Sequence, residues 1–413
     1  MNALLLTPPT QPVQATIALA SSKSESNRAL ILDALTGFRC QLDNLSTARD
    51  TQTMIRLLRE TASPTADVLD AGTTMRFLTA YFALTGQTKV MTGTPRMCER
   101  PIGLLVDALR TLGASITYLG QEGYPPLQTT GFTPTGLTEL SIRGDVSSQY
   151  ISALAMLAPY LPTGLTLNLT GTLGSVPYMT MTLQQMAVFG VTATADWTAQ
   201  TIQIPAGAYQ PTAYAIESDW SGASYWFSTV ALAETADIHL LGLKEQSLQG
   251  DSAIVGIMDQ LGVAATYTGR GFRLTKKEAA DHISVDFTNC PDLAQTVAVC
   301  CALKGIPATF TGIESLKIKE TDRVVAIQNE LRKFGADLVE VVPNERYEVR
   351  VVTTPASAEP VRIHTYDDHR MAMAFAPIAM LRPVIIDEPG VVAKSYPSFW
   401  DDFNLVANVE EAL

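Results

Sequence analysis

The feature that most limits how this chain can fold is one short pattern that recurs along its length. Four segments each combine an amphipathic helix, a closing Leu-Gly or Phe-Gly, and an alternating strand. Glycine suits the left-handed residue that ends a helix. The closing glycines are spaced by 77, 72 and 73 residues, and they are Gly113, Gly190, Gly262 and Gly335. This period predicts several copies of one structural unit.

A second set of helical segments alternates with the first and is apolar on nearly every side, as expected of buried helices. From the second onward they begin 70 to 76 residues apart, and they start near Ser22, Thr73, Ser148, Gly222, Asp292 and Asp368. The pattern therefore predicts six units, each with a buried helix, an amphipathic helix and several short strands. Three units precede Asp219 and three follow it. Because 413 residues exceed what one core normally holds, we expect two domains.

The composition narrows the classes of function. With a formal net charge of −12 and no run of about 20 apolar residues, the chain is predicted to bind neither nucleic acid nor membranes. The first ten residues lack the basic start and apolar run of a signal peptide. The five cysteines form no disulfide pattern and have no metal-type spacing with the four histidines, which predicts a reducing cytoplasm and no metal site.

Polar and cationic residues gather at the predicted helix starts. A helix N-terminus already carries unpaired N–H groups and a partial positive charge, so Lys and Arg there do not serve helix stability. Their recurrence predicts a bound anion with several negative groups, such as a phosphate or a carboxylate. These residues are Lys23, Ser24, Arg28, Thr73, Arg76, Arg100, Ser147, Ser148, Gln149, Ser175, Tyr178, Asp292, Lys319, Glu320, Arg323, His369, Arg370 and Lys394.

Several of these stretches form motifs that are highly specific in combination, above all "SKSESNR", "KETDR" and "DHRMAM". In them the chain resembles the 5-enolpyruvylshikimate-3-phosphate synthases, the enolpyruvyl transferases of the shikimate pathway. The likeness runs in order from near residue 20 to near residue 400. It also includes "AGTTMRFL", "PRMCERPI", "GDVSSQYISALAM", "SVPYMTMT" and "VAKSYPSFW".

The resemblance implies a two-domain inside-out α/β barrel of the enolpyruvyl transferase type. It would hold six βαβαββ-like repeats, three per domain. One discontinuous domain would comprise residues 1–20 and 219–413, and the inserted domain residues 21–218, with the active site in the cleft between them. The chain would act as a cytoplasmic monomer without metal or organic cofactor.

The implied reaction transfers the enolpyruvyl group of phosphoenolpyruvate to the 5-hydroxyl of shikimate 3-phosphate and releases phosphate. The implied base for the hydroxyl is Asp292, and the acid for the methylene carbon is Glu320 or Lys23. The resemblance places shikimate 3-phosphate on Lys23, Ser24, Arg28, Ser147, Ser148, Gln149, Ser175, Tyr178, Asp292, Ser315 and Lys319. It places phosphoenolpyruvate on Lys23, Gly72, Arg100, Gln149, Arg323, Arg370 and Lys394.

The chain departs from the family pattern at three places. Ala20-Ser21 replaces Pro-Gly, Asp70 replaces an asparagine, and Ser315 replaces another asparagine. These departures leave sensitivity to the competitor glyphosate open. Two alternatives also stay open. One is the sister UDP-N-acetylglucosamine enolpyruvyl transferase, which uses a loop cysteine where this chain has Cys98, and the other is a non-catalytic protein that binds phosphorylated metabolites.

Overall fold

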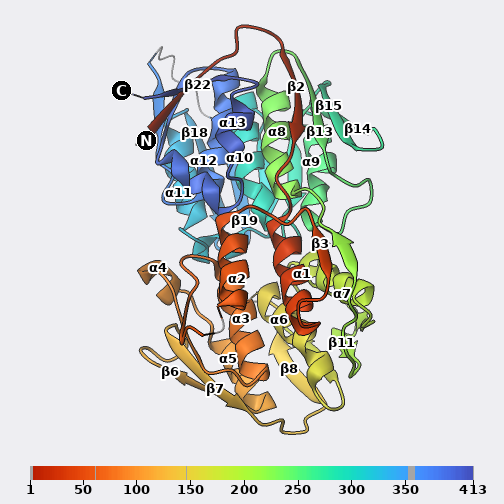
Figure 1. Cartoon of the computed structure of the whole chain (residues 1–413). Coiled ribbons are helices and arrows are strands. Elements are labelled where there is room, and N and C mark those ends of the chain that lie inside the picture. Colours follow the sequence, from red (N-terminus) through yellow and green to blue (C-terminus); the bar gives the residue numbers. More distant parts are fainter. Residues whose placement is uncertain (1–2, 61, 146, 352–358, 413) are drawn as a thin grey trace. The chain divides into compact units, whose positions relative to one another are not determined.

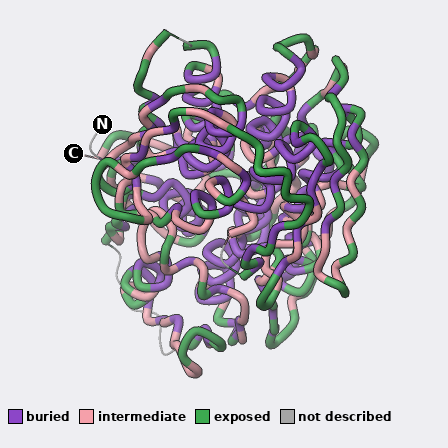
Figure 2. The backbone as a smooth tube through the Cα atoms, turned by 90° about the horizontal axis from the view of Figure 1, so that it is seen from below, coloured by how far each residue is buried: buried purple, intermediate pink, exposed green. Residues whose placement is uncertain are grey.

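A computed structural model describes residues 3–60, 62–145, 147–351 and 359–412 of the chain (Figure 1). Contacts between residues divide the chain into two compact units. Unit 1 comprises Met1–Ala20 and Glu217–Leu413, and unit 2 comprises Ser21–Ile216. Each unit combines short helices with small sheets and has its own hydrophobic core. In Figure 2 the helical turns are mostly buried, whereas many outer loops are exposed.

Each unit repeats one arrangement of a buried helix followed by an amphipathic helix. In unit 2 the helices are α1 (Lys23–Leu35), α2 (Arg49–Arg59), α3 (Gly72–Leu84), α4 (Pro95–Cys98), α5 (Gly103–Leu112), α6 (Ser148–Leu157) and α7 (Val176–Val188). In unit 1 they are α8 (Trp220–Leu232), α9 (Ile254–Gln260), α10 (Ala294–Lys304), α11 (Arg323–Arg332), α12 (His369–Phe375) and α13 (Phe399–Phe403).

The sheets repeat as well. In both units, four-stranded sheets each join one parallel pair of strands to two antiparallel pairs. The strands of unit 2 are β3 (Gln41–Asp43), β4 (Thr65–Asp67), β5 (Lys89–Thr92), β6 (Ala114–Tyr118), β7 (Leu127–Phe132), β8 (Glu139–Arg143), β9 (Leu165–Thr170), β10 (Thr194–Asp196), β11 (Thr201–Ile204) and β12 (Ala213–Ala215).

The N-terminal strands β1 and β2 belong to sheets of unit 1. β2 pairs in parallel with β13, with Val13 opposite Ala236, and β1 lies between β21 and β22. The strands of unit 1 are β1 (Ala3–Thr7), β2 (Val13–Ala18), β13 (Ala236–Leu241), β14 (Val263–Tyr267), β15 (Gly271–Lys276), β16 (Ile283–Asp286), β17 (Ala308–Thr311), β18 (Ala336–Val342), β19 (Arg346–Val351), β20 (Val361–Ile363), β21 (Val384–Asp387) and β22 (Asn408–Glu411).

The local signals that predicted the repeat have the expected conformations. The four closing glycines all have positive φ, between 72° and 112°. At the start of α1, Ser22 is the N-cap, and its hydroxyl accepts from the backbone N–H of Glu25 at 3.3 Å. α8 is buried along nearly its whole length, as predicted for a helix that is apolar on nearly every side.

Two predicted helix starts are wrong in detail. Asp292 lies in the 3-10 helix η3 (Pro291–Leu293), and the α-helix begins after it at Ala294. Lys394 is the last residue of another 3-10 helix, η6 (Pro389–Lys394), rather than the first of a helix. Both 3-10 helices open with a proline, which has no N–H to donate and suits a first turn.

The end of α5 provides a test of the repeat. Gly113 has φ 112°, and a Cβ there would lie 1.9 Å from the carbonyl oxygen of Thr133. We expect Gly113→Ala to lower the free energy of unfolding by roughly 1–3 kcal/mol, because it adds backbone strain and a clash. Gly256→Ala in α9 is the control. A Cβ at Gly256 meets nothing within 4 Å, so this change should be neutral or slightly stabilising in urea denaturation.

Candidate functional site

In unit 2, two cations project from the first turns of α1. The Nζ of Lys23 lies 2.9 Å from Oδ2 of Asp50, a buried carboxylate in α2. Sequence reasoning named Lys23 but missed Asp50. An acidic residue in the first turn of a helix normally interacts favourably with the helix dipole. The position of Asp50 therefore did not indicate that it pairs with a lysine.

Arg28 is buried and hydrogen-bonds to neutral groups. Its Nε donates to Thr182 Oγ1 at 2.7 Å, and its terminal nitrogens donate to the carbonyl oxygens of Ser24 and Tyr178 and to Ser152 Oγ. Burial lowers the pKa of Arg28 to about 10, although nearby Tyr178 and Glu25 oppose the shift. The guanidinium therefore stays charged at neutral pH. These contacts bring three predicted residues, Ser24, Arg28 and Tyr178, together.

Two further contacts join predicted residues of unit 2. A Cβ on Gly72 would lie 2.9 Å from a terminal nitrogen of Arg100, so only a glycine lets this guanidinium approach the start of α3. The Nε2 of Gln149 donates to Thr73 Oγ1 at 3.0 Å, which links the starts of α6 and α3.

The hydroxyl-bearing residues of unit 2 lie at two other helix starts. The hydroxyl of Ser147 caps α6 by accepting from the backbone N–H of Gln149 at 3.3 Å, and Ser148 is the first residue of that helix. Ser175 precedes α7 in a left-handed conformation, with φ 56°, and its side chain makes no capping bond. A non-glycine residue in this conformation stores strain, which is common at ligand sites.

The departure at Asp70 is compensated locally. Both carboxylate oxygens of Asp70 accept from the same terminal nitrogen of Arg49, at 3.0 and 2.9 Å. The added negative charge therefore has a cationic partner within unit 2. Arg49 and Asp70 are 21 residues apart in the chain, so no local pattern indicates which arginine pairs with Asp70.

In unit 1 the site residues surround the buried guanidinium of Arg323. Its Nε lies 2.7 Å from Asp368 Oδ2, and its terminal nitrogens contact Asp292 at 3.1 Å and Glu320 at 2.9 Å. Burial favours the neutral guanidine, but the charges of Asp368, Glu320 and Asp292 outweigh it and raise the pKa of Arg323. Asp368 caps α12 and was missed, since sequence alone reads it as an ordinary helix cap.

Three more cations surround this cluster. The terminal nitrogen of Arg370 lies 2.8 Å from Asp292 Oδ2, Lys394 lies 3.3 Å from Glu320, and Lys319 lies 3.9 Å from Asp292. Burial would raise the pKa of Asp292, but Arg370, Lys319 and Arg323 together hold it well below its usual value. His369 Nδ1 lies 3.6 Å from Asp368 Oδ1. Within the described residues, Ser315 makes no hydrogen bond or ion pair with the cluster; it lies in the 3-10 helix Glu314–Ile318, just before Lys319 in the chain, and is half-buried.

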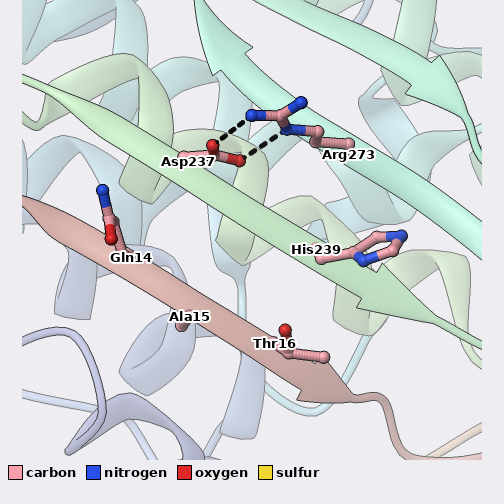
Figure 3. A pocket seen from close by; sticks show the side chains of 6 residues that line it. All are labelled: Gln14, Ala15, Thr16, Asp237, His239 and Arg273. Carbon is pink, nitrogen blue, oxygen red and sulfur yellow. Dashed lines mark hydrogen bonds and ion pairs between the residues drawn. The ribbon is translucent and has the colours of Figure 1, made fainter.

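A hollow of about 470 Å³ lies apart from these residues, on the face of the sheet formed by β2, β13 and β15 (Figure 3). Arg273 lines this hollow and pairs with Asp237. The Nε of Arg273 lies 2.9 Å from Oδ1 of Asp237. The hollow contains none of the predicted site residues. Among the residues that the structure describes, no cluster of metal-binding side chains and no helix long and apolar enough to cross a membrane occurs.

The cluster around Arg323 predicts a large effect on stability. Arg323→Ala would leave Asp292, Glu320 and Asp368 close together without their shared cation, and we expect a loss of about 3–5 kcal/mol in the free energy of unfolding. Arg332→Ala, at the other end of α11, is the control. The Arg332 side chain is 56% exposed and pairs with Asp337, so its loss should cost at most about 1 kcal/mol. If urea denaturation showed equal losses of unfolding free energy in the two variants, Arg323 would not be the shared partner that stabilises the three carboxylates.

Comparisons with known proteins identify the family of the chain. A family described as EPSP synthase (3-phosphoshikimate 1-carboxyvinyltransferase) matches residues 7–66 and 62–403. A 3-phosphoshikimate 1-carboxyvinyltransferase of Bacteroides fragilis is 49% identical over 405 residues, and one of Neisseria meningitidis is 36% identical over 426 residues. Each alignment covers 96% of both chains.

The solved structures show the fold. An EPSP synthase from Acinetobacter baumannii superposes with a TM-score of 0.78 at 18% identity and covers all of both chains. The predicted inside-out α/β fold is therefore confirmed. Because the family match and the relatives span almost the whole sequence, this chain belongs to the EPSP synthase (3-phosphoshikimate 1-carboxyvinyltransferase) family.

Proposed function

We propose that this chain transfers the enolpyruvyl group of phosphoenolpyruvate to the 5-hydroxyl of shikimate 3-phosphate, giving 5-enolpyruvylshikimate 3-phosphate and phosphate. One observation carries the proposal. In a chain 49% identical to a 3-phosphoshikimate 1-carboxyvinyltransferase over nearly its full length, Asp292 lies within contact of Arg323, Arg370 and Lys319. This arrangement offers a carboxylate base surrounded by cations that bind phosphate and carboxylate groups.

The proposed binding residues follow the assignment above. Shikimate 3-phosphate would contact Lys23, Ser24, Arg28, Ser147, Ser148, Gln149, Ser175, Tyr178, Asp292, Ser315 and Lys319. Phosphoenolpyruvate would contact Lys23, Gly72, Arg100, Gln149, Arg323, Arg370 and Lys394. The strained backbone of Ser175, whose hydroxyl makes no capping bond, and the charged Arg28 support the first set. The close approach of Arg100 to Gly72 supports the second.

The chemistry requires Asp292 to become a better base when the substrates bind. In the structure its neighbouring cations hold its pKa well below the usual value, so it would accept a proton poorly. Bound anions attract Arg370 and Lys319 and so weaken their hold on Asp292. The carboxylate can then take the proton of the 5-hydroxyl while that oxygen bonds to C2 of phosphoenolpyruvate.

The addition also needs a proton at the methylene carbon. Glu320 has ion pairs with Arg323 and Lys394, and such cations stabilise a carboxylate rather than the acid that must donate. The ammonium of Lys23 carries the required proton, and Asp50 holds it in position at 2.9 Å. These contacts favour Lys23 as the acid. Lys23, left as a neutral amine, can then take a proton back from the new methyl group while the bond between C2 and the phosphate oxygen breaks and phosphate leaves.

We also propose that the chain works in the cytoplasm as a monomer. All five cysteines are free, which fits a reducing compartment. The substrates are small anions, which a single copy of the chain can bind with the residues named above.

The first test compares two acceptors. Phosphate release from phosphoenolpyruvate should require shikimate 3-phosphate, and UDP-N-acetylglucosamine should not replace it. Cys98→Ser should retain activity within a few-fold of the parent, because Cys98 only weakly contacts the carbonyl of Gly93, at 3.8 Å, and the proposed steps need no thiol. Turnover of the sugar nucleotide, together with loss of that activity in Cys98→Ser, would instead support the sister enzyme.

The second test addresses the base. Asp292→Asn preserves shape but cannot take a proton, so kcat should fall about 100-fold or more at neutral pH. Asp286→Asn, an exposed position six residues earlier, controls for a general effect of the substitution and should retain activity. Near-normal turnover by Asp292→Asn would remove Asp292 from this role.

A further inference from the structure

A second carboxyl group is buried beside the cluster of unit 1, and the proposed chemistry does not use it. Asp251 lies in the 3-10 helix η2 (Gly250–Ala253) and is only 2% exposed. Its Oδ2 accepts a short hydrogen bond from Ser221 Oγ. Its Oδ1 is buried and has no hydrogen-bond partner in the described part of the chain. A buried carboxylate with one unsatisfied oxygen is costly, so this group needs an explanation.

Ser221 links this carboxyl to the proposed base. The same terminal nitrogen of Arg370 lies 2.8 Å from Asp292 Oδ2 and 3.5 Å from Ser221 Oγ. Arg370 therefore stands between two carboxyl groups, directly on Asp292 and through Ser221 on Asp251. Any movement of Arg370 toward a bound anion changes the electrostatic environment of both.

Burial and neighbouring groups bring the pKa of Asp251 close to neutral pH. Burial raises the pKa of Asp251 to about 7 and the charge of Asp292 adds to this, while Arg370 and the Ser221 hydrogen bond act in the opposite direction. Asp219 contributes a smaller negative charge from the start of α8.

Cys290 and Tyr225 also lie near Asp251 or Arg370, and neither changes charge near pH 7. Burial raises the pKa of the Cys290 thiol to about 12, with a contribution from Asp251, and burial raises the pKa of Tyr225 in α8 to about 12 as well. Both stay protonated at neutral pH. Unlike these two groups, Asp251 can gain a proton without an extreme pH.

We propose that Asp251 is a positioning residue that takes up a proton when anionic substrates draw Arg370 away from the Asp292–Ser221 pair. This inference rests on the proposed function and adds Asp251 to the residues of the proposed site. Binding removes a nearby positive charge and adds a negative one, and both changes disfavour the ionised carboxyl. Once protonated, Asp251 no longer competes for Arg370. Asp292 remains the carboxylate that can act as the base.

The test measures proton uptake on binding. Inorganic phosphate is titrated by calorimetry into the whole protein, alone and with shikimate 3-phosphate present, in buffers of different ionisation heats at pH 8. The parent should take up more protons per bound phosphate than Asp251→Asn, an uncharged mimic of the protonated acid. The ligands' own protonation is the same in both and cancels in the comparison. Equal uptake by the two proteins would overturn the proposal.

The pH profile provides a second readout. In the parent, kcat/KM should fall as pH rises through about 7 and beyond, by up to tenfold per pH unit, because proton uptake becomes unfavourable. Asp251→Asn should show a flatter profile over the same range. Profiles of the same shape for the two proteins would also contradict this role of Asp251, because a purely structural effect of the substitution would lower kcat/KM by the same factor at every pH.

Ser221→Ala keeps the inference testable if Asp251→Asn does not fold. It removes the hydrogen bond that lowers the pKa of Asp251, so the pH at which proton uptake is half-maximal should rise. An unchanged midpoint would overturn the proposal. Failure of shikimate 3-phosphate to bind the parent would instead overturn the proposed function, and the titration with phosphate alone would still decide the role of Asp251.

Discussion

The polar interior of unit 1 depends on one buried guanidinium, that of Arg323. It contacts Asp292, Glu320 and Asp368, which come from three separate segments of the chain. Removing the cation would leave these carboxylates uncompensated, and removing the carboxylates would leave a buried guanidinium without partners, which is costly in either case. The planar, five-donor head of Arg323 makes four hydrogen bonds to these three carboxylates, one more than the three donors of a lysine allow.

The cations of unit 1 and Arg28 of unit 2 have different partners. In unit 1 the charges of Arg323, Arg370 and Lys319 are balanced by protein carboxylates, so an incoming anion must compete for them. In unit 2, Arg28 hydrogen-bonds to neutral hydroxyl and carbonyl oxygens and packs near the rings of Phe77 and Tyr178. Its charge is thus less compensated. Under the proposed function, Arg28 would attract anions directly, whereas release of the unit 1 cations would change the basicity of Asp292.

The candidate site was largely predictable where a functional side chain is unusual for its position. Lys23, Arg28 and Arg323 stand out because cations at helix starts oppose the helix dipole. Asp50 and Asp368 were missed because acidic residues at helix starts are ordinary. Asp251 was missed for another reason. Its importance comes from burial and from Ser221 and Arg370, which are distant in the sequence.

The sequence by itself determined the repeat, the closing glycines and the buried helices, because these depend on local backbone preference and on the period of apolar residues. Its motifs also identified the family. Only the tertiary structure decided which charges meet: Arg49 with Asp70, Lys23 with Asp50, and Arg370 between Asp292 and Ser221. Such pairs join segments that are far apart in the chain, and the pKa of each group depends on burial and neighbours that no local pattern specifies.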